Sequence, residues 1–390
     1  MKKIVDLFAG CGGLSLGFQN AGFEIVGAFE CWKPAALCYE NNFNHHLFFT
    51  DLTDVDYAVN QIRELNPDII IGGPPCQEFS HAGKRVEDKI AALTESFAKI
   101  VVAIGPQWFV MENVDRAQKS AAYVVARKIF KDAGYGLTEV VLNASLCGAP
   151  QRRKRFFCIG SIEAQDGFLD GYIRQNLSET EMTLRDYFGN SLDFEYYYRH
   201  PRNYSRRAIY SINEPSATIR GVNRPVPLGY PGHQNDACKL NDSIRAMTTL
   251  ERALIQTFPP NFKWVGNKTE TEQMIGNAVP VKLAEFVAKV LAHHIVSTEN
   301  TSLISVDYSL FQEWLGKTQS MSDRVRHDNV SRLKRANSIC KIPANPDSLY
   351  LFLLEQTDEF KELSTSIRSQ LRRAVNLYSD FRRAGTRVNG

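Results

Sequence analysis

Short apolar runs alternate with stretches of helical periodicity over the first 160 residues of this 390-residue chain. This alternation is typical of βαβ units, and it predicts an α/β fold with a doubly wound, mostly parallel sheet. The expected strands span residues 4–7, 24–29, 47–49, 68–71, 108–111, 138–142 and 156–159. The expected helices span about residues 14–21, 32–43, 55–65, 94–104 and 123–133.

Chemically distinctive residues fall where several of the predicted strands end. They are Phe8, Gly10, Glu30, Asp51, Cys76 and Glu112. Open α/β sheets bind ligands in the crevice beyond the carboxyl ends of their strands. We therefore expect one crevice to collect a glycine turn, acidic residues and a thiol.

The pattern changes after Gly160. Residues 165–232 carry few periodic runs and are rich in tyrosine, arginine, asparagine and proline. Residues 196–207 interleave aromatic and cationic side chains, which suits contact with phosphates and bases; a tyrosine-rich loop that packs on itself is the alternative. Pro280 then starts an expected helix that runs to about Ile295. Beyond residue 302 the chain is helical and basic.

Composition and charge narrow the class of protein. Hydrophobic residues make up 44% and charged residues 23%, and no apolar run approaches the roughly 20 residues of a membrane helix. The eight cysteines include no Cys-x-x-Cys pair, which favours reduced thiols in a cytosolic enzyme and no zinc site. Net charge is only +3, but basic residues cluster at 151–155, 199–207 and 317–387, as phosphate contacts require.

Cys76 stands in the run Gly-Gly-Pro-Pro-Cys-Gln-Glu-Phe-Ser at residues 72–80, directly after an apolar strand. A thiol between a Pro-Pro turn and a polar loop is presented to a ligand rather than packed. It acts as a nucleophile only as the thiolate, and an unperturbed cysteine has a pKa near 8.5. Backbone N–H groups at the sheet edge could favour this anion. A cysteine that merely lies near a turn is the alternative.

A glycine turn, Asp-Leu-Phe-Ala-Gly-Cys-Gly-Gly-Leu at residues 6–14, follows the first strand. Its glycines let the backbone approach a ligand at a helix N-terminus. The dinucleotide fingerprint G-x-G-x-x-G would need a glycine where this chain has Ser15. Glu30 could accept hydrogen bonds from two ribose hydroxyls, which suits both NAD and S-adenosylmethionine. Hydride transfer has no use for Cys76, so the methyl donor is favoured.

Glu112 ends an apolar strand, where desolvation can raise the pKa of a carboxyl group so that it holds a proton. An acid of this kind could protonate ring N3 of cytosine and make carbon 6 electrophilic; a capped strand end is the alternative. Arg153 and Arg155 would share a face if the following strand alternates through them. They could hold a phosphate and the O2 of a base, although a solvated face is the usual explanation for a charge run.

Together these segments resemble the DNA (cytosine-5)-methyltransferase family from about residue 3 to residue 292. The matching segments follow the order of the family and are residues 6–13, 30, 51, 73–80, 112–114, 151–155 and 273–280. The resemblance implies a catalytic S-adenosylmethionine-binding domain of the Rossmann-like methyltransferase type and a smaller, irregular target-recognition domain. The domain bounds that we predict are 1–175 (catalytic), 176–272 (DNA recognition), 273–298 (a helix returning to the catalytic domain) and 299–390 (a helical, basic extension).

The resemblance also implies roles for individual residues. Cys76 would be the nucleophile and Glu112 the partner of N3, while Arg155 would contact the cytosine and Arg153 the target-strand backbone. The remaining predicted site residues would line the cofactor pocket. They are Phe8, Ala9, Gly10, Gly12, Gly13, Leu14, Glu30, Asp51, Leu52, Pro75, Leu93, Asn277 and Ala278.

The sequence departs from the family pattern at several places, and residues 248–253 match the segment before the last motif only loosely. Many members carry an aromatic residue directly after the ribose-binding acid, whereas here Cys31 comes first and Trp32 follows, so either could cover the adenine. After the catalytic loop, residues 87–89 and 93–94 replace the usual Asp-x-Arg and Leu-Phe, so the contacts of that loop are expected to differ. The segment 299–390 lies outside the family core, as a DNA-contacting, oligomerising or passive addition.

The predicted function is methylation of carbon 5 of a flipped-out cytosine in a short specific sequence of double-stranded DNA. S-adenosyl-L-methionine would be the cofactor, Cys76 would bond to carbon 6, and no metal is expected. We expect a cytoplasmic modification enzyme of a prokaryotic restriction–modification system, monomeric on nucleoid DNA, with a cognate endonuclease for the same site. The alternatives are an RNA (tRNA) cytosine methyltransferase of the same fold, a non-catalytic DNA-binding regulator and a nicotinamide dehydrogenase.

Overall fold

The computed structural model describes residues 2–75, 84–201, 203, 205–301, 306–343 and 346–386. The chain forms two compact units. The larger unit comprises Lys2–Asn20 and Glu24–Val287, and the smaller one comprises Ala21–Phe23 and Ala288–Gly390 together with Met1. The two units are described in turn, and the predicted catalytic pocket and recognition region both lie in the larger one.

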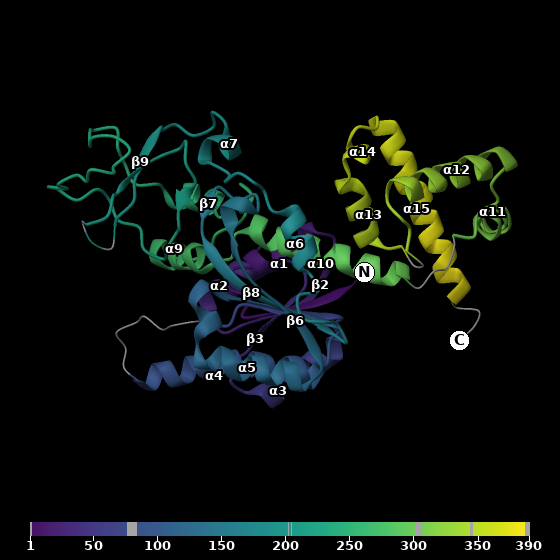
Figure 1. Ribbon diagram of the computed structural model, residues 1–390, viewed down its shortest axis with the longest axis horizontal. Coiled ribbons are helices and arrows are strands. Elements are labelled where there is room, and N and C mark those ends of the chain that lie inside the picture. The colour runs from purple at the N-terminus through teal and green to yellow at the C-terminus, as the bar shows by residue number, and fades with distance from the viewer. Residues whose placement is uncertain are drawn as a thin grey trace. The chain divides into compact units, whose positions relative to one another are not determined.

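A seven-stranded sheet forms the centre of the larger unit (Figure 1). Its strands, in spatial order, are β3 (His46–Phe49), β2 (Glu24–Glu30), β1 (Lys3–Leu7), β4 (Ile69–Gly72), β5 (Trp108–Val114), β8 (Lys154–Ile162) and β6 (Tyr135–Asn143). The first five strands run parallel, whereas β8 is antiparallel to both β5 and β6. The doubly wound, mostly parallel sheet predicted from the hydrophobic pattern is therefore confirmed.

Helices cover both faces of this sheet (Figure 1). Apolar side chains of α3 (Val55–Leu65), α4 (Lys84–Ile104) and α5 (Ala121–Asp132) form one core with the strands. The opposite face packs on α1 (Gly13–Asn20), α2 (Lys33–Glu40) and the first part of α10 (Val281–Thr301). Helix α4 begins ten residues before the expected start at Thr94. Residues 84–89 include arginine, glutamate and lysine, which are strong helix formers and extend the helix.

The segment after the sheet has little regular structure, as its sequence predicts. It holds α6 (Asp170–Asn176), α7 (Leu184–Phe188), α8 (Thr249–Ile255), α9 (Lys268–Asn277) and the short strands β9 (Tyr196–Tyr198), β10 (Ile209–Ser211) and β11 (Ser216–Ala217). Strand β11 pairs in parallel with β7 (Gln151–Arg152), directly before β8. Capping boxes fix the starts of α7, α8 and α9, so these short helices are anchored although the loops between them are irregular.

The smaller unit is helical, as predicted for the C-terminal extension. It contains the end of α10, then α11 (Tyr308–Lys317), α12 (Asp323–Ile339), α13 (Ser348–Gln356), α14 (Asp358–Lys361) and α15 (Thr365–Thr386). An aromatic cluster of Phe311, Trp314, Tyr378 and Phe381 joins α11 to α15. Within the part of the chain that the structure describes, none of the helices combines the length and apolar character needed to cross a membrane.

Candidate active site

A pocket of about 530 Å³ opens at the carboxyl ends of the parallel strands. The structure brings together here most of the residues that the sequence predicted for the site. The predicted residues that line the pocket are Phe8, Ala9, Gly10, Gly13, Leu14, Glu30, Asp51, Leu52, Pro75, Leu93, Glu112, Arg155, Asn277 and Ala278. Cys31 and Trp32 also line it. We call this cavity the strand-end pocket.

The glycine turn after β1 is built around the carboxylate of Glu30. The N–H of Gly10 donates to Oε2 of Glu30 at 2.8 Å, and the N–H groups of Cys31 and Trp32 donate to Oε1 at 2.9 and 2.6 Å. The turn requires left-handed backbone at Phe8 (φ 59°) and at Gly10 (φ 57°). Glycine adopts this conformation freely, whereas the phenylalanine is strained by about 1 kcal/mol or more. Burial raises the pKa of Glu30, and the three N–H bonds oppose that shift.

Gly12 has a different place from the one predicted for it. It does not line the strand-end pocket, and a Cβ atom at Gly12 would lie 2.3 Å from the ring of Phe43. Gly12 also has positive φ (94°), so no other residue fits there without strain. Gly13 does line the pocket, and its Cβ would lie 2.4 Å from the carbonyl oxygen of Val279. The glycines therefore serve close packing of the turn as well as access for a ligand.

A chain of hydrogen bonds that the sequence did not reveal starts from Asp6 in this pocket. Ser15 Oγ donates to Oδ2 of Asp6 at 2.6 Å, the Ser15 and Tyr39 hydroxyls lie 2.7 Å apart, and Nε2 of His45 lies 2.6 Å from the Tyr39 hydroxyl. Burial raises the pKa of Asp6 to about 7 and lowers the pKa of His45 to about 4. Among the described residues, no hydrogen bond reaches Oδ1 of Asp6.

Glu112 and Arg155 form an ion pair at the opposite end of the pocket. In the antiparallel ladder Glu112 faces Phe157 and Arg155 faces Val114, so the two charged residues are diagonal neighbours on one face. Nε of Arg155 lies 2.9 Å from Oε1 of Glu112, and both side chains are largely buried, at 14% and 10% exposure. Burial raises the pKa of Glu112, while the guanidinium groups of Arg155 and Arg153 oppose that shift.

The start of the predicted catalytic loop is tied to the end of β5. Nδ2 of Asn113 donates to the carbonyl oxygen of Pro74 at 3.1 Å, and a Cβ at Gly73 would lie 3.0 Å from Oε2 of Glu112. Pro75, which precedes Cys76 in the chain, lines the pocket. Cys76 itself lies outside the described residues. Asn113 lies in the matching segment 112–114, but no sequence pattern indicates its contact with the loop.

Arg153 differs from the interpretation of its sequence pattern. Strand β8 begins at Lys154, so the expected alternation does not include Arg153. Its guanidinium is buried and donates to the carbonyl oxygens of Ile219, Gly276 and Ala278 at 2.8, 2.8 and 3.0 Å. In this arrangement Arg153 joins Ile219 to the end of α9 through a buried guanidinium. The three carbonyl groups need a donor, and the planar guanidinium supplies it.

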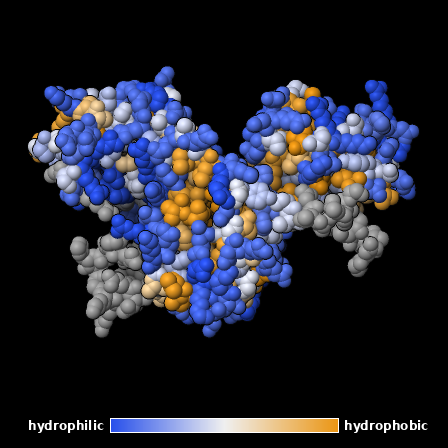
Figure 2. Space-filling model, in the orientation of Figure 1, coloured by the Kyte–Doolittle hydropathy of each residue, from blue (hydrophilic) through white to orange (hydrophobic). Residues whose placement is uncertain are grey.

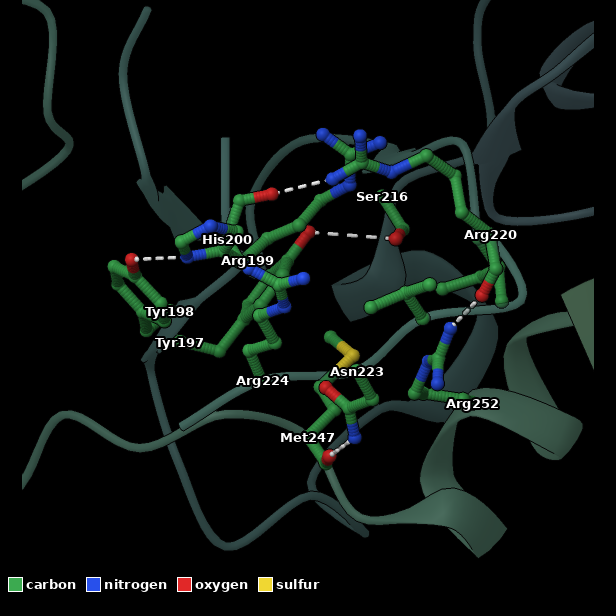
Figure 3. A pocket seen from close by; sticks show the side chains of 12 residues that line it. Tyr197, Tyr198, Arg199, His200, Ser216, Arg220, Asn223, Arg224, Met247 and Arg252 are labelled. Carbon is green, nitrogen blue, oxygen red and sulfur yellow. Dashed lines mark hydrogen bonds between the residues drawn. The ribbon is translucent and has the colours of Figure 1, made fainter. Parts of the chain in front are cut away.

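A second, smaller pocket of about 30 Å³ lies in the recognition region (Figure 3). Four arginines and a histidine line it, and no acidic residue is among the described residues of its wall; the arginines are Arg199, Arg220, Arg224 and Arg252, and the histidine is His200. Burial and the neighbouring arginines lower the pKa of His200. We call it the arginine pocket. Arg252 pairs with the buried Glu272, and nearby Arg199 and Arg220 help burial to lower the pKa of Arg252 to about 10. The wall itself therefore carries an excess of positive charge.

The loop at residues 220–224 forms one edge of the arginine pocket. Along this loop, residues that contact neighbouring segments alternate with residues whose side chains are exposed. A Cβ at Gly221 would lie 2.3 Å from Oε1 of Gln273, and Nδ2 of Asn223 donates to the Met247 carbonyl oxygen at 2.7 Å. Between and beyond these anchors, Val222 is 57% exposed and Arg224 is exposed. The loop therefore holds an apolar and a cationic side chain outward on a fixed backbone.

Comparison with known proteins gives close matches over the first three quarters of the chain. The profile of the family described as "C-5 cytosine-specific DNA methylase" matches residues 2–293. Type II methyltransferase M.HgiDI of Herpetosiphon aurantiacus is 55% identical over 294 residues, which cover 75% of this chain and 95% of that protein. Type II methyltransferase M.HindV of Haemophilus influenzae is 54% identical over 291 residues, with 74% and 96% covered.

Solved structures share the fold at much lower identity. The S. pombe Dnmt2 methyltransferase has a TM-score of 0.56 at 16% identity and covers 75% of this chain and 99% of its own. The Entamoeba histolytica methyltransferase EhMeth has a TM-score of 0.54 at 16% identity, with 76% and 99% covered. Because the family profile spans most of the chain and the two relatives exceed 50% identity over nearly their whole length, this chain belongs to the C-5 cytosine-specific DNA methylase family.

Proposed function

We propose that this chain is a type II DNA methyltransferase that transfers a methyl group from S-adenosylmethionine to carbon 5 of cytosine within a specific duplex sequence. The observation that carries the proposal is the composition of the strand-end pocket. One cavity joins the glycine turn and Glu30 to the Glu112–Arg155 pair and to Pro75, the neighbour of Cys76 in the chain. A ribose-binding acid and an acid–base pair for a pyrimidine are thus present together.

The residues of the pocket fit S-adenosylmethionine. A carboxylate has about four lone-pair positions, and backbone N–H groups fill three of them on Glu30, so Oε2 can still accept a ribose hydroxyl. Oδ1 of Asp6 is buried without a partner among the described residues, and a cationic ligand would compensate its charge. Both Phe29 and Trp32 line the pocket near Glu30, but Phe29 is fully buried and Trp32 is partly exposed, so we assign Trp32 to the adenine. S-adenosylmethionine, when bound, supplies an electrophilic methyl group on a sulfonium centre.

Glu112 would act on the cytosine ring from its buried position. Its raised pKa lets it hold a proton that it can share with N3, which withdraws electrons from carbon 6. Arg155 would fix the carboxyl group and donate to O2 of the base. The Cys76 thiolate would form a bond to carbon 6, and carbon 5 would accept the methyl group. Loss of the carbon-5 proton to a base and cleavage of the carbon–sulfur bond would then restore the aromatic ring and the thiolate.

The target base would have to leave the duplex. Sulfur must reach the face of the cytosine ring, and stacked neighbours block that face in duplex DNA. The arginine pocket and the loop at residues 220–224 offer the contacts that would hold the remaining DNA. Guanidinium groups bind phosphates and pair with guanine edges, and the exposed Val222 could contact a base methyl group. We therefore assign DNA recognition to residues 176–272.

The names of the relatives support a place in restriction–modification. M.HgiDI and M.HindV are both type II methyltransferases. We propose that this chain protects its target sequence from a cognate endonuclease, and that it acts as a monomer on nucleoid DNA in the cytoplasm. The family membership disfavours a nicotinamide dehydrogenase, because that reaction needs neither Cys76 nor the Glu112–Arg155 pair.

Transfer of labelled methyl groups tests the proposal. The full chain is incubated with methyl-labelled S-adenosylmethionine and either duplex DNA or tRNA, and the products are digested to nucleosides. We expect label in 5-methylcytosine of duplex DNA only. Cys76→Ser should abolish transfer, whereas Cys340→Ser, a half-buried cysteine of the C-terminal unit, should leave it unchanged. Label in tRNA alone would favour the RNA enzyme, and equal activity of wild type and Cys76→Ser would contradict the mechanism.

A further inference from the structure

The C-terminal helical unit is an addition to the family fold. The family profile ends at residue 293, and M.HgiDI matches over 95% of its own length with only 75% of this chain. The unit is nevertheless well packed. Leu333 of α12, Leu353 of α13 and Leu371 of α15 are all buried in its core. A folded unit that the family fold does not need is a candidate for a separate interaction.

Charge is unevenly distributed along this unit. Residues 317–341, which include α12, hold seven lysines and arginines against two acidic residues. Residues 342–363, which include α13 and α14, hold five acidic residues against Lys361 alone. Residues 364–387, which include α15, are basic again, with six arginines against Asp380 alone. The unit therefore has an acidic part, which includes α13 and α14, and two basic parts, one of which centres on α12.

The outward face of α12 carries much of this positive charge. At 100° per residue, one arc of about 120° contains side chains that are all exposed: Arg324, His327, Ser331, Lys334, Arg335 and Ser338. We call this arc the α12 face. The opposite side of the helix is buried through Val330, Leu333 and Ala336. In Figure 2 the surface over α12 is predominantly hydrophilic.

The acidic residues of α12 do not neutralise this face. Asp323 pairs with Arg326, and Asp328 lies 4.0 Å from Arg332, so each acid is matched by an arginine outside the α12 face. Within the described residues, neither Arg324 nor Arg335 takes part in an ion pair. Lys334 lies over the ring of Tyr308 at 5.2 Å, which orders its side chain and leaves its charge uncompensated.

We propose that the α12 face binds the phosphate backbone of duplex DNA outside the methylated sequence, an inference that rests on the proposed action of this chain on DNA. Arg324 and Arg335 are eleven residues apart, or about 16 Å along the helix, a span over which several phosphates are reached. Ser331 and Ser338 are small side chains that permit close approach to a phosphate, and Ser331 adds a hydroxyl donor, whereas the Ser338 hydroxyl donates to the Arg335 carbonyl oxygen at 2.8 Å. The face holds no aromatic or large aliphatic side chain, which a membrane or a protein partner would require as an anchor.

Salt-dependent DNA binding by the full chain tests this inference. Each phosphate contact contributes about 0.9 to the slope of log affinity against log salt concentration. The variant Arg324→Gln/Lys334→Gln/Arg335→Gln should therefore lower that slope by about two to three and weaken binding about tenfold at low salt. The rate of methylation at saturating DNA should stay unchanged, because none of the three residues belongs to the strand-end pocket.

Two matched variants separate a phosphate contact from a general effect of charge. Arg324→Lys/Arg335→Lys keeps the charge and should keep the slope, because a phosphate backbone accepts either cation. Lys361→Gln removes an exposed cation from α14 and should also leave the slope unchanged. Wild-type methylation of the same DNA is measured first, so failure of the proposed function is seen separately. A triple variant that methylates DNA and binds it with the wild-type salt slope would overturn the inference. The inference would also fail if Lys361→Gln lowered the salt slope as much as the triple variant does.

Discussion

The strand-end pocket and the arginine pocket differ in framework and in charge. The strand-end pocket is formed by the ends of five parallel strands and is lined by Asp6, Glu30, Asp51 and Glu112. The arginine pocket is formed by loops and short strands, and no acid is found among the described residues of its wall. A cavity lined by acids suits a cationic cofactor and a nucleobase that accepts a proton, whereas a cavity lined by arginines suits a polyanion.

Under the proposed function, this difference separates two tasks within one unit. Chemistry needs side chains held at fixed distances, and a hydrogen-bonded sheet supplies that rigidity through the register of β5 and β8. Recognition needs a surface that can vary, and anchored loops supply it. In the loop at residues 220–224, Gly221 and Asn223 fix the backbone while Val222 and Arg224 are presented outward.

The largest expected effect is on chemistry. Glu112→Gln keeps the shape of the side chain but cannot donate a proton to N3, so the methylation rate should fall about 10²- to 10⁴-fold. Steady-state methylation of duplex DNA measures it. The control Glu139→Gln breaks another glutamate–arginine pair, between β6 and Arg127 of α5, outside the pocket. A rate within threefold of wild type for Glu112→Gln would remove the general acid from the mechanism.

A smaller effect is expected on cofactor binding. Glu30→Gln replaces one carboxylate oxygen by an amide nitrogen, which cannot accept the hydrogen bonds that backbone N–H groups donate to Glu30. The Kd for S-adenosylmethionine should therefore rise about 10- to 100-fold. Calorimetric titration without DNA measures this Kd. Glu24→Gln changes an exposed glutamate at the start of the same strand and should bind normally. Unchanged affinity in Glu30→Gln would place the ribose elsewhere.

DNA binding should respond to the arginine pocket and not to the strand-end pocket. Arg224→Gln should weaken binding of duplex DNA about tenfold and lower the salt slope by about one, with normal affinity for S-adenosylmethionine. A fluorescence titration at several salt concentrations measures both quantities. Arg174→Gln, an exposed arginine on α6, serves as the control. If both variants lose affinity equally, the arginine pocket has no special role.

The smallest effect concerns Asp6 and pH. Because its folded pKa is raised to about 7, the neutral carboxyl group stabilises the fold below about pH 4, and this contribution is lost as pH rises through 7. His45 is present in both wild type and Asp6→Asn, so its own titration cancels when the two are compared over a window of about pH 5 to 8. Wild type should lose a few degrees of melting temperature relative to Asp6→Asn across that window, seen by thermal unfolding. A constant difference would contradict the buried neutral acid.

The regular part of the fold could be predicted because its periodicity is local. Alternating strands and amphipathic helices placed Glu30, Asp51 and Glu112 at strand ends, and parallel strands bring such ends together. The hydrogen-bond chain from Asp6 to His45 could not be predicted, since its members join only through tertiary packing.

Other differences between the sequence-based prediction and the structure arise because one sequence feature can have two physical causes. A glycine in a turn can admit a ligand or a neighbouring side chain, and Gly12 admits the ring of Phe43. An arginine in a basic run can face solvent or donate to buried carbonyl groups, and Arg153 does the latter. Only the position of the surrounding chain decides between them.

Trapping of a covalent complex tests the central claim most directly. Duplex DNA with 5-fluorocytosine at the target is incubated with the full chain and S-adenosylmethionine, then denatured and analysed by electrophoresis. Because fluorine cannot leave carbon 5 as a proton does, wild type should form a denaturation-resistant adduct that maps to Cys76, and Cys76→Ser should form none. An enzyme that methylates ordinary DNA yet yields no adduct, or one joined through another residue, would contradict the account.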